Sequence, residues 1–311
     1  MTSSKKSIAS SLLLLLTALV WGLSFTAQSV GMEEAGPLSF NGTRMILGGL
    51  ALLPVILFND SRLKKSGKPF VKFSDKTLIK GGLLCGIVLF IASTLQSFGI
   101  VRTTVGKSGF ITALYVLFVP IFALLFFRKK TTLKIWICAG FALFGMYLLC
   151  INGKSGINFG DFLTLLCAIA FSFHILVIDK YSPLTDGIKL SCYQFLTCGI
   201  ISSIISVFVE HNQAANLISA WLPLCYAAFG SCALGYTLQV VAQKNLNPTV
   251  ASIICSFESV FALLGGMLLL KEAPSSRELE GCAIMFIAII VAQIPIEDFI
   301  KAKHKNSSGT A

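Results

Sequence analysis

The chain has 311 residues, of which 55% are hydrophobic and 13% are charged, and its mean hydropathy is +0.82. A soluble domain of this length would have about a quarter of its residues charged, so these values exclude that class. The net charge of +11 could suggest nucleic-acid binding, but the cations cluster in short breaks between apolar runs. Apolar runs of about 20 residues are typical of helices that cross a lipid bilayer.

The apolar runs predict ten helices joined by short connections, which leaves little room for a soluble domain. Proline stands before or within the first turn of several of them, at Pro37, Pro223, Pro248 and Pro274. The first run continues to about Val30, so we interpret it as a retained span and not as a cleaved signal peptide. The expected helices cover residues 8–30, 38–58, 78–100, 105–127, 133–151, 160–180, 188–209, 218–242, 249–270 and 279–297.

The positions of the cations predict the orientation of the chain. If the N-terminus is cytoplasmic, the inner loops and termini carry most of the lysines and arginines, Lys189 among them. This asymmetry follows the positive-inside rule and places both termini in the cytoplasm. The basic balance therefore indicates topology and contact with anionic lipid, and no nucleic-acid partner is expected. The outer side would carry only Arg102, Lys107, Lys154, Lys271 and Arg277.

The ten cysteines raise the question of a disulfide or metal site. None forms a CxxC pair, and no His or Asp is grouped with them at ligand spacing. Small apolar packing residues are the expected interpretation, so neither a metal nor another cofactor is predicted. The cysteines are Cys85, Cys138, Cys150, Cys167, Cys192, Cys198, Cys225, Cys232, Cys255 and Cys282.

Two halves of the chain, residues 8–151 and 160–297, repeat one another. The offset between matching residues is 150 early in the halves and 143 later, and we expect the loop near residues 59–77 to absorb the difference. Each half holds five apolar stretches, and an odd number of spans inserts the second copy upside down. The sequence therefore predicts an all-α integral membrane protein of ten transmembrane helices in two inverted five-helix repeats, an architecture typical of alternating-access carriers. The notable aligned pairs are Trp21 with Phe171, Ser24 with His174, Arg44 with Gln194, Gln96 with Gln239, and Tyr115 with Glu258.

Several short segments carry a family resemblance. The first two expected helices contain Leu19-Val20-Trp21-Gly22-Leu23-Ser24-Phe25, then Pro37 and Arg44. The ninth contains Ser256-Phe257-Glu258-Ser259-Val260-Phe261-Ala262 and leads to Leu270-Lys271-Glu272. In this order, over about residues 10 to 295, the chain resembles EamA-type carriers of the drug/metabolite transporter superfamily.

That resemblance implies a central cavity near the membrane midplane, with the fifth and tenth helices at the periphery, where a homodimer contact is possible. It implies a transporter and not an enzyme, with a small-molecule substrate. We expect a secondary-active exporter of a small organic metabolite such as an amino acid, a nucleoside or an organic cation. Because the chain has no GxxxxGK[ST] loop, proton coupling or exchange would drive transport in place of ATP. The fold alone does not fix the substrate.

Glu258 is the strongest candidate for a substrate-binding residue. It lies about nine residues into its expected helix, or roughly 14 Å deep, near the bilayer midplane. An ionisable group at that depth is costly, which makes a functional role the default hypothesis. Glu258 could bind a proton or an organic cation, or it could be a structural carboxylate that caps neighbouring groups. Tyr115, its repeat partner, is also polar and supports the functional interpretation.

Arg44 and His174 are further candidates within the spans. Arg44 could snorkel outward and pair with Glu33 or Glu34, anchor to backbone carbonyls, or bind an anionic group of the substrate. Its repeat partner Gln194 is neutral, so the halves differ chemically there. His174 could be a hydrogen-bonded packing residue, a proton relay or a ligand contact.

Two polar stripes at helical spacing complete the candidate site. In lipid such stripes must face partner helices or a wet cavity, so we expect a cavity lining or a gate. Gln96 joins them because it matches Gln239 in the repeat. Trp21 could stack on a ring or a cation of the substrate. The stripes consist of Trp21, Ser24 and Gln28 on the first helix, and Cys232, Tyr236, Gln239 and Gln243 on the eighth.

Three other functions stay open on sequence grounds. An intramembrane enzyme would need a nucleophile–base pair or a metal cluster, yet the chain lacks HExxH, and His174, His211 and His304 lie far apart in the sequence. A channel would need a continuous polar pore, and a flippase for lipid-linked sugars would need a lateral slot between helices. A bacterial inner membrane is the expected location.

Overall fold

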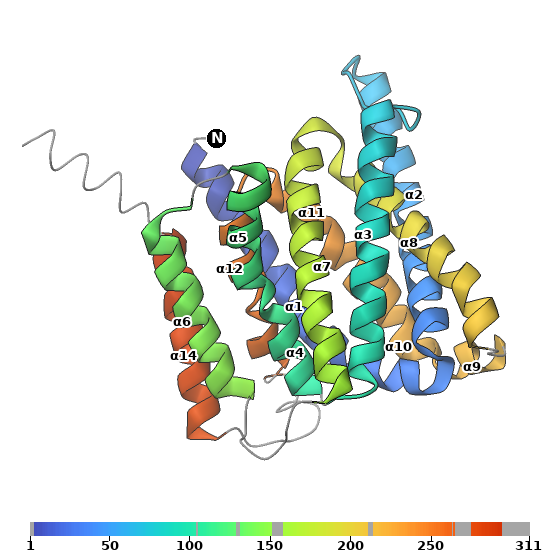
Figure 1. The fold of residues 1–311 in the computed structure, drawn as a ribbon. Coiled ribbons are helices and arrows are strands. Elements are labelled where there is room, and N and C mark those ends of the chain that lie inside the picture. Colours follow the sequence, from blue (N-terminus) through green and yellow to red (C-terminus); the bar gives the residue numbers. More distant parts are fainter. Residues whose placement is uncertain are drawn as a thin grey trace, which may run out of the picture.

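The computed structural model describes residues 3–103, 105–128, 131–150, 158–210, 214–262, 264 and 275–293, and every regular element in these ranges is a helix (Figure 1). The first half contains α1 Ser3–Ala35, α2 Pro37–Lys65, α3 Lys76–Ile100, α4 Val105–Ala113, α5 Tyr115–Phe127 and α6 Leu133–Cys150. The second half contains α7 Phe159–Tyr181, the short 3-10 helix η1 Ser182–Leu184, α8 Gly187–Val209, α9 Ala214–Ser219, α10 Trp221–Cys225, η2 Tyr226–Tyr236, α11 Thr237–Gln243, α12 Pro248–Cys255 and α14 Ser276–Gln293.

Side chains at the N-termini explain where several helices begin. The Asp75 carboxylate accepts a hydrogen bond from the Leu78 amide and caps α3, and Asn158 and Asp161 form a reciprocal capping box on α7. Pro37 and Pro248 stand in the first turns of α2 and α12, as predicted. The expected start at Pro274 lies outside the described residues.

Seven described helices are long and apolar enough to cross a membrane, judged by length and composition. Three shorter apolar helices cover Leu133–Gly145, Pro248–Ala262 and Leu279–Ala288. The chain is therefore a multi-pass membrane protein, and the part of it that the structure describes has only helices as regular elements. The number of ten spans stays a prediction.

Two of the expected helices are interrupted at repeat-related positions. The helix expected over 105–127 is divided into α4 and α5 at Leu114, and the helix that begins with α12 has a turn at Ser256 and Phe257. At both breaks a backbone amide donates a hydrogen bond to the carbonyl oxygen three residues earlier. Leu114 N donates to Ile111 O at 3.2 Å, and Phe257 N donates to Ile254 O at 3.2 Å. Neither break lies at a proline, and each directly precedes a polar residue of the candidate site, Tyr115 or Glu258.

The helix expected over 218–242 is also not uniform. It consists of α10, the π-helix η2 over Tyr226–Tyr236, and α11. π-helical turns are rare and occur often at functional sites, because the wider turn displaces side chains from their regular α-helical positions. Glycine and alanine make up much of η2, so few side chains oppose the wider turn.

The helices pack in pairs that the repeat relates to one another. α3 packs on α7, α1 packs on η2 and α11, and α2 packs on α8. α6 and α14 lie side by side at one edge of the molecule (Figure 1). Gly82 and Gly86 lie against Tyr193 and Thr197 of α8, where small residues allow the helices to pack closely. The loop expected over 59–77 is shorter than predicted, because α2 continues to Lys65.

We expect Gly199→Ala to disturb the contact between α2 and α8. A Cβ atom at Gly199 would lie 2.7 Å from Ile46 Cγ1 and 2.9 Å from Ile46 N, so backbone must shift to accept it. Overpacking of this kind lowers the free energy of unfolding by about 1–3 kcal/mol. Gly140→Ala is the matched control, since a Cβ there meets nothing within 4 Å and should change stability by less than about 1 kcal/mol. Equal losses in chemical unfolding of the two variants would contradict the close-packing argument.

Candidate functional site

A small internal cavity lies among the helices of both halves. Its volume is about 30 Å³, which is room for about one or two water molecules and not for an organic solute. Among the residues that the structure describes, none of α2, α6, α8 or α14 lines the cavity. The lining residues are Trp21, Phe25 and Gln28 of α1, Gln96 of α3, Thr112 of α4, Tyr115 of α5, Phe171 and Ile175 of α7, Ser231 and Tyr236 of η2, Gln239 of α11, and Glu258.

Most of the lining consists of residues that the repeat relates. One related pair consists of two aromatic residues, another of two glutamines, and a third of Tyr115 and Glu258. Matching positions of the two halves therefore face the same space. The pairs are Trp21 with Phe171 and Phe25 with Ile175 at an offset of 150, and Gln96 with Gln239 and Tyr115 with Glu258 at an offset of 143.

Glu258 and Tyr115 meet across this cavity. Tyr115 Oη donates a hydrogen bond to Glu258 Oε1 at 3.2 Å, and both residues are only 3% exposed. No cationic side chain among the described residues forms an ion pair with Glu258. A buried carboxylate with one neutral donor is poorly stabilised as an anion, so it favours uptake of a proton or a cation.

The amides around the cavity leave hydrogen-bond acceptors without donors. Gln28 Nε2 donates to Ser24 Oγ at 3.1 Å, and Gln96 Nε2 donates to Thr112 Oγ1 at 3.5 Å. The Oε1 atoms of Gln28 and Gln239 have no donor within the described ranges. Together with Glu258, they place hydrogen-bond acceptors at this cavity.

Two aromatic residues are held in fixed orientations at the cavity. Trp21 Nε1 donates to the Ser231 carbonyl oxygen at 3.3 Å, and its ring centroid lies 4.6 Å from that of Tyr236. Gly235 allows this approach, because a Cβ there would lie 2.8 Å from Trp21 Nε1. The rings of Trp21 and Tyr236 therefore pack on one another, and both residues line the cavity together with Phe171.

Arg44 does not line the cavity, contrary to the prediction. It is buried on α2, where its Nε and Nη2 donate to Asn41 Oδ1 at 3.1 and 2.9 Å. The predicted snorkelling and pairing with Glu33 or Glu34 are wrong, because both glutamates are exposed at the end of α1 while Arg44 is 1% exposed. The cause is the packing of α2 on α8 and on η2, which buries Arg44 between helices.

His174, Gln194 and Ser24 also lie behind the cavity wall. His174 Nε2 and Gln194 Oε1 are 3.0 Å apart, and both residues are completely buried. The His174 ring meets Tyr236 edge to face, with centroids 6.1 Å apart. His174 is thus a hydrogen-bonded packing residue that supports a lining residue, and Ser24 supports Gln28 in the same way.

Sequence reasoning missed several lining residues because they are small or apolar. Phe25, Thr112, Ile175 and Ser231 were not predicted. Phe25 and Ile175 could have been found from the repeat, since they stand 150 residues apart. Ser231 carried no signal, because its place at the cavity depends on the π-helix η2. Of the polar stripes, Cys232 instead packs on Met45, and Gln243 donates to the Ile175 carbonyl oxygen at 3.4 Å.

Comparison with known proteins identifies relatives along almost the whole chain. The EamA-like transporter family model matches residues 8–151 and 158–293. An uncharacterized transporter of Archaeoglobus fulgidus is 29% identical over 283 residues, which are 91% of this chain and 85% of that protein. The uncharacterized inner membrane transporter YedA of Escherichia coli strain K12 is 24% identical, over 89% of this chain and 88% of its own.

Two further similarities are more distant. An S-adenosylmethionine uptake transporter of Rickettsia bellii is 20% identical over 247 residues, which are 79% of this chain and 80% of that protein. A protein of known crystal structure superposes with a TM-score of 0.75 at 14% identity, over 91% of this chain and 96% of the other. That structural similarity shows a shared fold.

Proposed function

Because the chain belongs to the EamA-like transporter family, we propose that it is a secondary-active carrier that exports a small organic cation in exchange for protons. Membership of this family and the names of the relatives place it among membrane transporters. The observation that carries the finer proposal is Glu258, a carboxylate at the cavity that no cation of the described residues neutralises.

The chemistry of the lining favours a cationic substrate over an anionic one. A positively charged group with N–H donors would pair with Glu258 and satisfy the free acceptors of Gln28 and Gln239. The ring faces of Trp21 and Tyr236 would add cation–π contacts. S-adenosylmethionine, named for the Rickettsia relative, carries a sulfonium and an ammonium group and thus belongs to this chemical class.

One carboxylate that binds either a proton or a cation couples the two by exchange. Each cycle would carry the cation one way and return with the proton. Where the proton gradient points into the cell, this exchange drives export of the cation. The Rickettsia relative is named for uptake, so transport in the inward direction is the alternative to export.

The two halves support alternating access as the mechanism. We propose that residues 8–151 and 160–297 are inverted five-helix repeats with ten spans in total. The two ranges matched by the family model and the repeat-related pairs at the cavity both support this arrangement. A cavity of about 30 Å³ admits a solute only when the lining helices separate. The distribution of cations supports an inner-membrane location with both termini in the cytoplasm.

A thermal-shift screen of the purified protein tests the substrate class. The panel contains S-adenosylmethionine, spermidine, tetraethylammonium, neutral nucleosides and dicarboxylates. Ligand binding raises the melting temperature in proportion to RT ln(1 + [L]/Kd), so a titration separates specific from general effects. We expect stabilisation by cations, weakened as the pH is lowered because protons compete for Glu258. Stabilisation by dicarboxylates alone would overturn the cationic class.

Transport in proteoliposomes tests the coupling. Vesicles are loaded with the stabilising cation and diluted into buffer of lower pH, and efflux of the cation is measured together with internal pH. Exchange predicts efflux accompanied by internal acidification, and the efflux should slow when the vesicles are diluted into buffer of the same pH. A rate of cation efflux that does not depend on the pH gradient would refute proton exchange but not the carrier function.

A further inference from the structure

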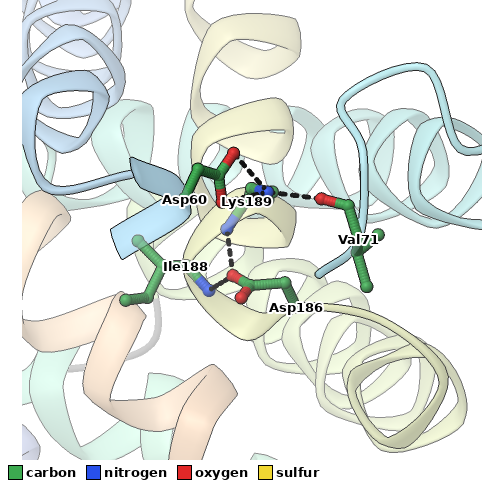
Figure 2. Close-up of polar contacts among 5 residues, drawn as sticks. All are labelled: Asp60, Val71, Asp186, Ile188 and Lys189. Atoms are coloured by element: carbon green, nitrogen blue, oxygen red, sulfur yellow. Dashed lines mark hydrogen bonds and ion pairs between the residues drawn. The ribbon is translucent and has the colours of Figure 1, made fainter. Parts of the chain in front are cut away.

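An ion pair between a buried lysine and a partly exposed aspartate joins α2 to α8 at one end of these helices. The Lys189 ammonium lies 2.6 and 2.8 Å from the two carboxylate oxygens of Asp60, and it also donates to the carbonyl oxygen of Val71 (Figure 2). The rings of Phe70 and Phe73 cover it, with their centroids 5.2 and 5.5 Å from Nζ. The Lys189 side chain is only 2% exposed. This cation, expected from sequence only to set topology, therefore has a structural role.

At the opposite end of the same helix pair, another carboxylate joins α8 to α2. The Glu210 carboxylate, just after α8, accepts hydrogen bonds from the amides of Leu38 and Ser39 at 2.6 and 2.8 Å. It also accepts one from the Ser39 hydroxyl at 2.8 Å. A carboxylate at the first turn of a helix is favoured by the free N–H groups and by the helix dipole. Glu210 thereby fixes the beginning of α2 to the end of α8.

The internal repeat relates these two contacts. Glu210 stands 150 residues after Asp60, and Lys189 stands 150 residues after Ser39. In each contact a carboxylate near the end of one helix holds the residue near the start of the other. The partner differs, since it is an ammonium at one end and a helix N-terminus at the other.

Between its two ends the α2–α8 interface is tightly closed. A Cβ atom at Gly42 would lie 2.4 Å from Ser203 Oγ, and one at Gly49 would lie 3.0 Å from the Leu196 side chain. Asn41 Nδ2 donates to Ser202 Oγ at 2.9 Å in the same interface. Neither helix contributes to the cavity lining.

We infer that α2 and α8 form a fixed spine, closed at both ends by the repeat-related carboxylates Asp60 and Glu210, and that access to the cavity changes by movement of the helices around it. In an alternating-access carrier a gate is open at one end while it is closed at the other. A helix pair held at both ends at once cannot open without breaking a buried polar contact. The second half of this inference rests on the proposed carrier function, and the first half does not.

Reversible cross-linking tests whether the spine opens. The variants Asp60→Cys/Lys189→Cys and Ser39→Cys/Glu210→Cys are linked with a short, reducible bifunctional thiosulfonate, and mass spectrometry of the linked peptides verifies the bond. Because the chain has ten cysteines of its own, the controls are variants that carry only one of the two added cysteines and receive the same reagent. We expect transport of the cation found in the screen to stay within about twofold of the unlinked protein. A loss of transport that dithiothreitol reverses would overturn the inference, because it would identify that end as a gate.

Hydrogen–deuterium exchange of the unsubstituted protein gives a test that needs no transport and no variant. We expect the amides of Leu38 and Ser39, which donate to Glu210, to exchange far more slowly than those of residues 258–262, between pH 6 and 8 after correction for intrinsic rates. If the amides held by Glu210 exchange as fast as those of residues 258–262, the inference of a fixed spine is refuted. If no solute is transported at all, the proposed function fails while this measurement still decides the spine.

Discussion

Glu258→Gln is expected to abolish proton-coupled transport in proteoliposomes while the protein still folds. Glutamine keeps the size of the side chain and can still accept a hydrogen bond from Tyr115 Oη, now 3.2 Å from Glu258 Oε1. It cannot take up a proton or neutralise a cation in the cavity. We expect the coupled rate to fall by about 100-fold or more, the range typical of losing a group that transfers protons. The measurements are cation efflux and internal pH under an imposed gradient.

Tyr115→Phe is the matched control for that result. It removes the hydroxyl that donates to Glu258 but keeps the ring and the carboxylate. A hydrogen bond to a charged group contributes about 1.5–3 kcal/mol, so cation affinity should change by about 10- to 150-fold with coupling retained. Proton-coupled efflux at the normal rate in Glu258→Gln would refute the role of this carboxylate, whatever Tyr115→Phe does.

The sequence predicts much of the fold because lipid imposes a simple rule on it. A segment that crosses a bilayer must be long, apolar and helical, and the expected ranges 38–58 and 188–209 accordingly lie within α2 and α8. Interruptions of helices follow a different logic. Leu114 and Phe257 are ordinary apolar residues without local signals for a break, and η2 arises within a run that reads as regular helix. These features depend on tertiary packing, which a single sequence does not reveal.

The same distinction explains the outcome for the candidate site. The cavity brings together Trp21, Gln96, Tyr115, Tyr236, Gln239 and Glu258, all of which were predicted, and several of these positions match in the repeat. Four other predicted site residues are buried but do not line the cavity: Ser24, Arg44, His174 and Gln194. Polarity within a span shows that a side chain needs a polar partner. It does not show whether that partner is a solute or, as for Arg44, a neighbouring asparagine.

Asp60→Asn is expected to destabilise the protein more than Lys189→Met, although both break the same ion pair. The side chain of Lys189 is 2% exposed and that of Asp60 is 22% exposed. Asp60→Asn leaves a buried ammonium without its counter-ion, and such a loss costs about 3 kcal/mol or more. Lys189→Met leaves Asp60 partly hydrated and keeps an apolar stem against Phe70 and Phe73, so the cost should be about 1 kcal/mol.

Unfolding of the purified variants in mixed micelles with increasing sodium dodecyl sulfate measures these differences. The double variant Asp60→Asn/Lys189→Met should recover most of the stability lost in Asp60→Asn, because it removes the unpaired cation. Lys189 is not held as a buried charge if Lys189→Met lowers the free energy of unfolding more than Asp60→Asn does. The same conclusion follows if the double variant loses as much free energy of unfolding as the two single variants together. The asymmetry matters beyond stability. A cation that cannot be left without its carboxylate keeps α2 and α8 together at this end, which is what a fixed spine requires.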